Sequence, residues 1–162
     1  MRDDGLEAET GLRPAGPGDA ARVVELMAGF NAELELPFDR ARGRRLVEDL
    51  LAAPALGRIW LIERAGRDVG YVALCFGFSF EWGGRDGIVD ELFVEPAWRG
   101  RGVARAALSA LLADAARLGL RAVHLEVERG SAAAERLYRS LGFEGKDRQL
   151  LTRPLGQRAA ST

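Results

Sequence analysis

The fold is decided by the stretch Val94-Glu95-Pro96-Ala97-Trp98-Arg99-Gly100-Arg101-Gly102-Val103-Ala104. An apolar strand, expected at residues 88–94, runs into a turn rich in glycine and arginine, and an amphipathic helix begins near Gly102. The first turn of a helix carries N–H groups without an intrahelical acceptor, and the helix dipole adds partial positive charge there. Gly100 and Gly102 leave the backbone accessible, and Arg99, Arg101 and Arg105 add full charges that suit phosphate oxygens. The stretch therefore predicts a diphosphate-binding site.

The glycine turn does not fit the two commonest phosphate-binding motifs. No Gly-Lys-Ser/Thr ends the loop, which excludes a Walker A motif, and no early βαβ unit frames the glycines as a dinucleotide fingerprint would require.

Two motifs carry a family resemblance instead. The first is Glu91-Leu-Phe-Val94-x-Pro96-x-x-Arg99-Gly100-x-Gly102-Val103-Ala104, and the second is Ser131-x-x-Ala134-x-x-Leu137-Tyr138-x-x-x-Leu141-Gly142-Phe143, preceded by Leu125-Glu-Val127. In order and spacing they resemble the GNAT superfamily of acetyl-CoA-dependent N-acetyltransferases. The resemblance covers roughly residues 10–155.

The resemblance implies an acetyl-CoA site and no metal. It assigns the pyrophosphate to the turn and helix start, and the pantetheine arm to a strand that carries a bulge and splays from its neighbour. The residues expected to bind the cosubstrate are Leu92, Phe93, Val94, Arg99, Gly100, Arg101, Gly102, Val103, Ala104, Ser131 and Tyr138. Ser131 stands where many members have Asn, and a helix-capping role competes with contact to pantetheine.

Hydrophobic periodicity places the elements of a mixed α/β fold. Strands are expected at 9–14, 58–64, 69–80, 88–94, 121–128 and 149–155, with a turn at 81–87. Helices are expected from the caps Asp19 and Asp39, from 102 to 118, and from Ser131. Their apolar stripes are Val23, Leu26, Met27 and Phe30 in the first helix and Leu46, Val47, Leu50 and Leu51 in the second. We expect a mostly antiparallel sheet of about 6–7 strands with four helices, splayed between 88–94 and 121–128 as the resemblance implies.

The bulk properties describe a single domain. With 162 residues we expect a flexible segment at 1–9, one domain at 10–155 and a flexible tail at 156–162. A net charge of −1 gives no basic face for nucleic acid, and no apolar run approaches the roughly 20 residues of a membrane helix. The acidic N-terminal residues lack an apolar signal core, which favours the cytoplasm. The single cysteine, Cys75, is expected to be a small buried residue, and one histidine with one cysteine leaves no zinc motif.

The catalytic candidates follow from the resemblance and from acid–base chemistry. Tyr138 aligns with the family's usual general acid, and a phenol, with a pKa near 10, can protonate a thiolate. The base is left open among Asp90, Glu91, Glu126 and an ordered water. Asp90 and Glu91 resemble an acidic pair of the spermidine/spermine acetyltransferase branch, and Glu126 matches the base proposed for the ribosomal-protein acetyltransferase branch.

The remaining polar candidates have simpler explanations. Strand pleating puts Asp90 and Glu91 on opposite faces unless a bulge re-aims one of them. His124 alternates with core positions, so a packing role is favoured over that of a base. Glu33 and Glu35 could face a cationic substrate, although solvated loop charges are favoured.

The sequence thus predicts an enzyme that transfers an acetyl group from acetyl-CoA to a small cationic amine by direct attack. A peptide or protein α-amine is the alternative acceptor, and a non-catalytic acyl-CoA sensor is the alternative from another class. Homodimers are common in the family, which makes a homodimer possible here.

Overall fold

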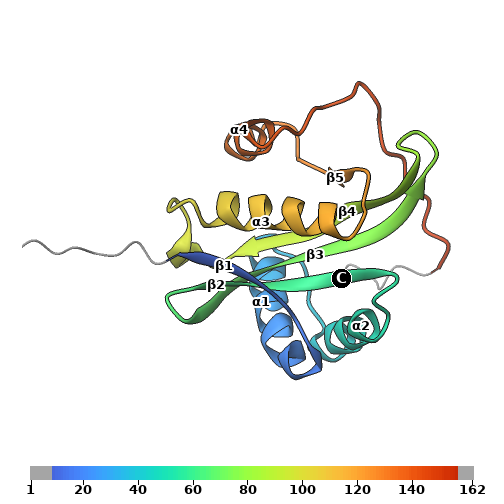
Figure 1. Cartoon of the computed structure of the whole chain (residues 1–162). Helices are drawn as coiled ribbons and strands as arrows, with labels where there is room; N and C mark the ends of the chain where they lie inside the picture. The colour runs from blue at the N-terminus through green and yellow to red at the C-terminus, as the bar shows by residue number, and fades with distance from the viewer. Residues whose placement is uncertain (1–8, 157–162) are drawn as a thin grey trace, which may run out of the picture.

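The computed structural model describes residues 9–156, as a five-stranded mixed sheet between two layers of helices (Figure 1). The expected flexible ends, apart from residues 9 and 156, lie outside the described residues. In chain order the elements are β1 (Thr10–Pro14), η1 (Pro17–Asp19), α1 (Ala20–Glu33), α2 (Arg40–Ala52), β2 (Gly57–Arg64), β3 (Arg67–Ser79), β4 (Gly84–Val94), η2 (Pro96–Trp98), α3 (Val103–Arg117), β5 (Val123–Leu125) and α4 (Ala132–Ser140). None of the helices within this range has the length and hydropathy needed to span a bilayer.

The sheet is mixed and mostly antiparallel, as expected. Its strand order is β1-β2-β3-β4-β5, with antiparallel pairs throughout except for the parallel pair β4–β5. Helices α1 and α2 lie on one face and α3 on the other (Figure 1). On one face of the sheet, Tyr71 and Phe93 pack in a buried hydrophobic cluster with residues of α1. On the other face, Trp60 and Leu74 pack with Leu108 of α3. The parallel β4–α3–β5 crossover therefore covers one face and the two N-terminal helices cover the other.

The expected strand count and three strand boundaries were wrong. The sheet has five strands rather than 6–7, because residues 149–155 form no strand and β5 spans three residues instead of 121–128. Leu150, Leu151 and Leu155 are all more than 70% exposed, so the apolar pattern that suggested a last strand does not face a core. Strand β4 begins at Gly84 rather than 88, since most of the expected turn at 81–87 pairs with the end of β3.

The helix starts agree with the sequence, although the two caps differ in chemistry. The carboxylate of Asp39 accepts hydrogen bonds from the backbone N–H groups of Ala41 and Arg42, as an N-cap should. The carboxylate of Asp19 instead accepts from the Gly16 N–H and from the guanidinium of Arg13. These contacts, the Arg13 hydrogen bond first, hold the pKa of Asp19 below its usual value.

The apolar stripes of the first two helices were only partly correct. Val23 and Leu26 of α1 are buried as expected, and Val24 is buried beside them. In α2, Val47 is buried, but Leu46 is 51% exposed and faces away from the core.

A β-bulge divides β4 into two parts. Leu74 pairs with Val89 and Ala73 pairs with Glu91, so Asp90 is the extra residue. The ladder with β5 runs only from Gly87↔Val123 to Val89↔Leu125, while β4 continues to Val94. Beyond the bulge, the β5-facing edge of β4 has left its partner strand. This is the splay that the resemblance implies.

Candidate active site

The turn between η2 and α3 forms an open cradle of backbone N–H groups. The first hydrogen bond of α3 joins the Ala106 N–H to the Gly102 carbonyl over 3.0 Å, so the amides of Val103, Ala104 and Arg105 precede the helical pattern. Gly100 and Gly102 have φ values of 71° and 73°, in the left-handed region that favours glycine. No atom lies within 4 Å of a Cβ built at either glycine, and no acidic side chain occupies the first turn. The cradle is therefore open and fits an anion such as a pyrophosphate.

The arginines of the turn divide into two roles. The Arg99 Nε donates to the Val94 carbonyl over 2.8 Å, and its guanidinium forks onto the Glu33 carboxylate and lies 5.4 Å from the Phe93 ring centroid. Arg99 thus ties the turn to α1 and β4. The hydrogen bond from Arg99 lowers the pKa of Glu33, which is accordingly engaged in an ion pair. Arg101 lies over the Trp98 ring at 5.8 Å and stays exposed beside the cradle.

The opened edge of β4 supplies the second part of the site. Leu92 is half-buried and packs towards the α3 side, while Phe93 and Val94 are 5% and 7% exposed. The strand is therefore fixed by its side chains, whereas its edge beyond Val89 is not paired with β5. A free strand edge fits an extended ligand that carries amide groups.

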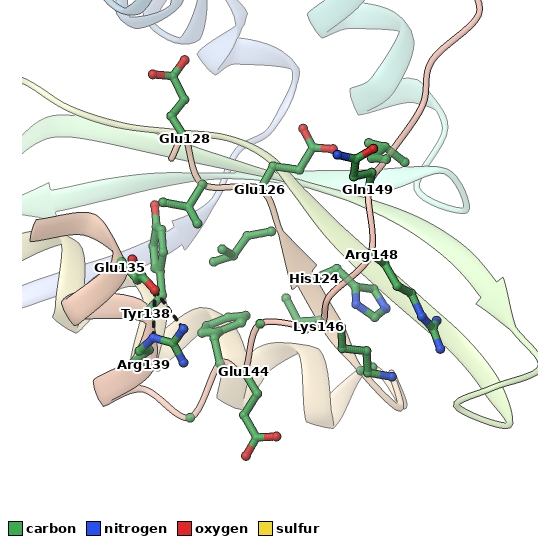
Figure 2. A pocket seen from close by; sticks show the side chains of 18 of the residues that line it. His124, Glu126, Glu128, Glu135, Tyr138, Arg139, Glu144, Lys146, Arg148 and Gln149 are labelled. Carbon is green, nitrogen blue, oxygen red and sulfur yellow. Dashed lines mark hydrogen bonds and ion pairs between the residues drawn. The ribbon is translucent and has the colours of Figure 1, made fainter. Parts of the chain in front are cut away.

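Tyr138 lies on α4, and Ser131 stands at the N-terminus of the same helix. Tyr138 is half-buried, its ring packs edge-on against Phe143 at 6.0 Å, and burial raises the pKa of its phenol. It lines a groove of about 1270 Å³ between β5, α4 and residues 142–152. In Figure 2 the hydroxyl of Tyr138 points towards the chain that carries Glu126 and Glu128. Ser131 occupies the N-cap position, but its hydroxyl makes no capping hydrogen bond.

The bulge brings Asp90 and Glu91 close together. Glu91 pairs with Ala73, on the α1 face of the sheet, and its carboxylate accepts a 2.5 Å hydrogen bond from the hydroxyl of Tyr71. Burial raises the pKa of the Glu91 carboxyl and of the Tyr71 phenol, and the nearby negative charge of Asp90 raises both pKa values further. Burial likewise raises the pKa of the half-buried Cys75 thiol, with smaller contributions from the two carboxylates. Both acids therefore lie near Tyr71 and Cys75, which is consistent with the bulge that the sequence analysis required to put them on one face.

The other carboxylate considered as a base lies elsewhere. Glu126 follows β5 and is exposed along the groove that Tyr138 lines (Figure 2).

His124 is more exposed than its alternation with core positions suggested, and it pairs with an acid. Its side chain is 41% exposed, and its Nε2 lies 3.2 Å from the Asp86 carboxylate. The two residues are 38 positions apart, and only the parallel register Ile88↔His124 brings them together. Asp86 lay in the expected turn, so no signal in the sequence pointed to the pair.

These parts together define a class of protein. A helix N-terminus open to a pyrophosphate, a bulged strand with a free edge and a half-buried phenol on a neighbouring groove are the features of an acyl-CoA-dependent acyltransferase. The model of the acetyltransferase (GNAT) family matches residues 24–143, and the chain belongs to that family. It is an acetyl-CoA-dependent N-acetyltransferase, with acetyl-CoA as its cosubstrate.

Two relatives illustrate the range of acceptors in the family. The chain is 28% identical to an aminoglycoside N(6')-acetyltransferase type 1 of Stenotrophomonas maltophilia, over 85% of this chain and 88% of that protein. It is 35% identical to the N-alpha-acetyltransferase RimI of Mycobacterium tuberculosis, over 72% of this chain and 60% of the relative.

Solved structures show the same fold. An integron cassette protein from the mobile metagenome of Cole Harbour Salt Marsh is 37% identical, with a TM-score of 0.82 and 91% of each chain covered. An acetyltransferase from Clostridium acetobutylicum solved with acetyl-CoA is 20% identical, with a TM-score of 0.72 over 90% of this chain and 96% of that chain.

Proposed function

We propose that the enzyme acetylates a primary amine of a small cationic molecule. The observation that carries this proposal is the line of carboxylates on one face of the sheet. Asp86, Asp90 and Glu91 share that face, because Asp86 and Glu91 pair with Gly77 and Ala73 and the bulge lies between them. Negative charge beside the end of the β4–β5 ladder attracts an ammonium group to the point where the strands separate.

Each residue of the site has a distinct task in this proposal. The amides of Val103, Ala104 and Arg105, with Arg101, hold the pyrophosphate, and the edge of β4 from Leu92 to Val94 aligns the pantetheine arm. When bound, acetyl-CoA supplies the acetyl group as an activated thioester. A preorganised N–H near Val94 that stabilises charge on the reacting carbonyl would contribute roughly 3 kcal/mol.

Proton transfer is assigned to the acids and to Tyr138. Asp90 and Glu91 bind the ammonium and accept its proton, directly or through a water, so that the neutral amine can attack. Tyr71 holds Glu91 in place through its 2.5 Å hydrogen bond. Tyr138 donates its phenolic proton to the leaving thiolate, and the second proton that the nitrogen loses as the amide forms restores the phenol, so that the proton taken up by the acids is the one released overall.

A peptide α-amine is the second candidate acceptor, and the 35% identity to an N-alpha-acetyltransferase favours it. A peptide brings one ammonium and a backbone, whereas a small polyamine or amino sugar brings several charges. A non-catalytic acyl-CoA sensor would keep the cradle without turnover.

Thiol release from acetyl-CoA tests the proposal with a panel of polyamines, aminoglycosides, amino acids and short peptides. We expect turnover on cationic small molecules, and at least about tenfold lower kcat/KM in Asp90→Asn and Glu91→Gln, since charge-assisted contacts contribute about 1.5–3 kcal/mol. Glu48→Gln is the matched control, because Glu48 pairs with Arg44 on the exposed surface of α2. Turnover on peptides alone would assign the second candidate, and tight CoA binding without any turnover would favour the sensor.

The cytoplasmic location and the homodimer stay predictions. Light scattering of the purified protein would test the homodimer.

A further inference from the structure

His124 has no role in the reaction described above, and with Asp86 it forms a built polar site. The Asp86 carboxylate is 16% exposed and lies 3.2 Å from the Nε2 of His124, whose side chain is 41% exposed. When the carboxylate is ionised and the ring is neutral, Nε2 donates its hydrogen to the carboxylate and Nδ1 is left as an acceptor. In the described part of the chain, Nδ1 has no hydrogen-bond partner.

The Asp86 carboxylate occupies space that a side chain at Gly77 would need. A Cβ built at Gly77, directly across from Asp86, would lie 2.7 Å from the Asp86 Oδ1. Real Cβ contacts are not that short, so a larger residue at 77 would displace the carboxylate. The glycine and the acid therefore form a matched pair across β3 and β4.

The surroundings of His124 hold the ring in place. The ring of Trp82 lies 6.2 Å from it, and the Lys146 ammonium lies 4.9 Å from the Trp82 ring. Lys146 and Arg148 both pair with Glu81, which offsets their charge. Figure 2 shows His124 between the β5 backbone and the segment that carries Lys146 and Arg148, at the edge of the groove.

The register places this pair a short distance from the reaction centre. His124 is directly opposite Ile88, and the bulge residue Asp90 lies two positions further along β4. Two strand residues span roughly 7 Å. A molecule that presents an amine at Asp90 could therefore reach His124 with a second polar group.

We propose that Asp86 and His124 form a second acceptor subsite, which binds a hydrogen-bond donor, a second amine or a hydroxyl, carried by the same molecule. The inference rests on the proposed function and narrows its acceptor class. The expected acceptors are amines with a second polar group roughly 7 Å from the first, the span of two strand residues. The Nδ1 of His124 accepts the hydrogen bond, and Asp86 fixes the tautomer and adds negative charge. His124 is thus a specificity residue, and Asp86 positions it.

Two amines that differ only in a second amino group can distinguish a subsite at His124 from a general effect of this residue on folding or turnover. Putrescine and butylamine have the same chain length, but only putrescine carries a second amine. Binding of each to the CoA-saturated protein is measured by calorimetry, and kcat and KM by thiol release. In His124→Leu we expect putrescine to bind about tenfold more weakly, as the loss of a hydrogen bond to a charged group predicts, and butylamine to change less than about twofold.

Three further variants keep the result independent of folding defects. Asp86→Asn and Gly77→Ala should reproduce the selective loss for putrescine, and His124→Gln should restore part of it, because an amide oxygen also accepts a hydrogen bond. Equal losses for both amines, or no loss for either, would overturn the subsite. Binding of both amines without thiol release would instead contradict the proposed function and leave the subsite standing.

Discussion

The two halves of the sheet differ sharply in how they are held. Every fully buried hydrophobic side chain among the described residues lies between Ala20 and Ala115, in the half built from α1 to α3 and β2 to β4. In the other half, β5 and α4 contain no fully buried residue, and the chain beyond α4 exposes Leu150 and Leu151. One half is a closed core, and the other is a half-covered groove.

The residues of the proposed site are distributed over both halves. The cradle and the bulged strand are fixed by the closed half, where Val103 is 1% exposed and Phe93 is 5% exposed. Tyr138 and His124 belong to the open half, whose contacts to the core are partial. We infer that the cosubstrate, lying between the halves, supplies contacts that the open half lacks.

The largest expected effect contrasts a leucine from each half. Leu111 is fully buried under the sheet, so Leu111→Ala should reduce the free energy of unfolding by about 2–5 kcal/mol. Leu137 of α4 is only half-buried, and Leu137→Ala should cost clearly less, about 1–2 kcal/mol, because less apolar area is lost. Denaturant unfolding measures both. Equal losses would remove the distinction between the halves.

The next effect tests the cradle of the closed half. Arg101→Ala should weaken CoA binding by about 1–3 kcal/mol, the range for a charge-assisted contact. Arg117→Ala, at the far end of the same helix, is the control and should leave the Kd for CoA unchanged. Calorimetry gives both values. An unchanged Kd in Arg101→Ala would reject its contact with the pyrophosphate.

Tyr138→Phe tests the open half without disturbing its packing. The ring contact with Phe143 remains, so the Kd for CoA should stay the same. Turnover should fall at least about tenfold, because the variant has no proton to donate. Full activity in this variant would transfer the general-acid role to another group.

The smallest effect concerns Glu91, at the boundary between the two halves. Burial raises its pKa in the folded protein, so the folded state binds more protons than the unfolded state between the usual glutamate pKa and the raised one. Stability contributed by this group should therefore fall as pH rises through that window. Glu91→Gln should flatten this part of the stability–pH curve by about 1 kcal/mol or less, as measured by urea unfolding. A curve that keeps its slope would assign the pH dependence to other groups.

The same division explains how much the sequence could predict. Elements of the closed half follow from strong local signals, such as the Asp39 cap and the glycine turn before α3, and most of these predictions were confirmed. In the open half the apolar residues 150 and 151 suggested a strand, yet they do not pack against the core. Local pattern cannot distinguish an apolar segment that has a partner from one that has none.

The candidate site shows the same limit at the level of single residues. The family motifs predicted Tyr138 and the cradle as site residues from the sequence alone. The Asp86–His124 pair depends on the parallel register of β4 and β5, and the Tyr71–Glu91 hydrogen bond depends on the pairing of β3 and β4. Such contacts between distant positions follow from topology and become visible only in the folded chain.

The central claim is that the cosubstrate lies in the gap that opens beyond Val89 and joins the two halves. Amide hydrogen exchange with and without CoA tests it most directly. We predict slower exchange on CoA binding at the β4 edge, residues 90–94, at the first turn of α3, residues 103–105, and across α4 as the open half becomes ordered. Unchanged exchange at residues 90–94 and 103–105, with CoA bound, would contradict the account.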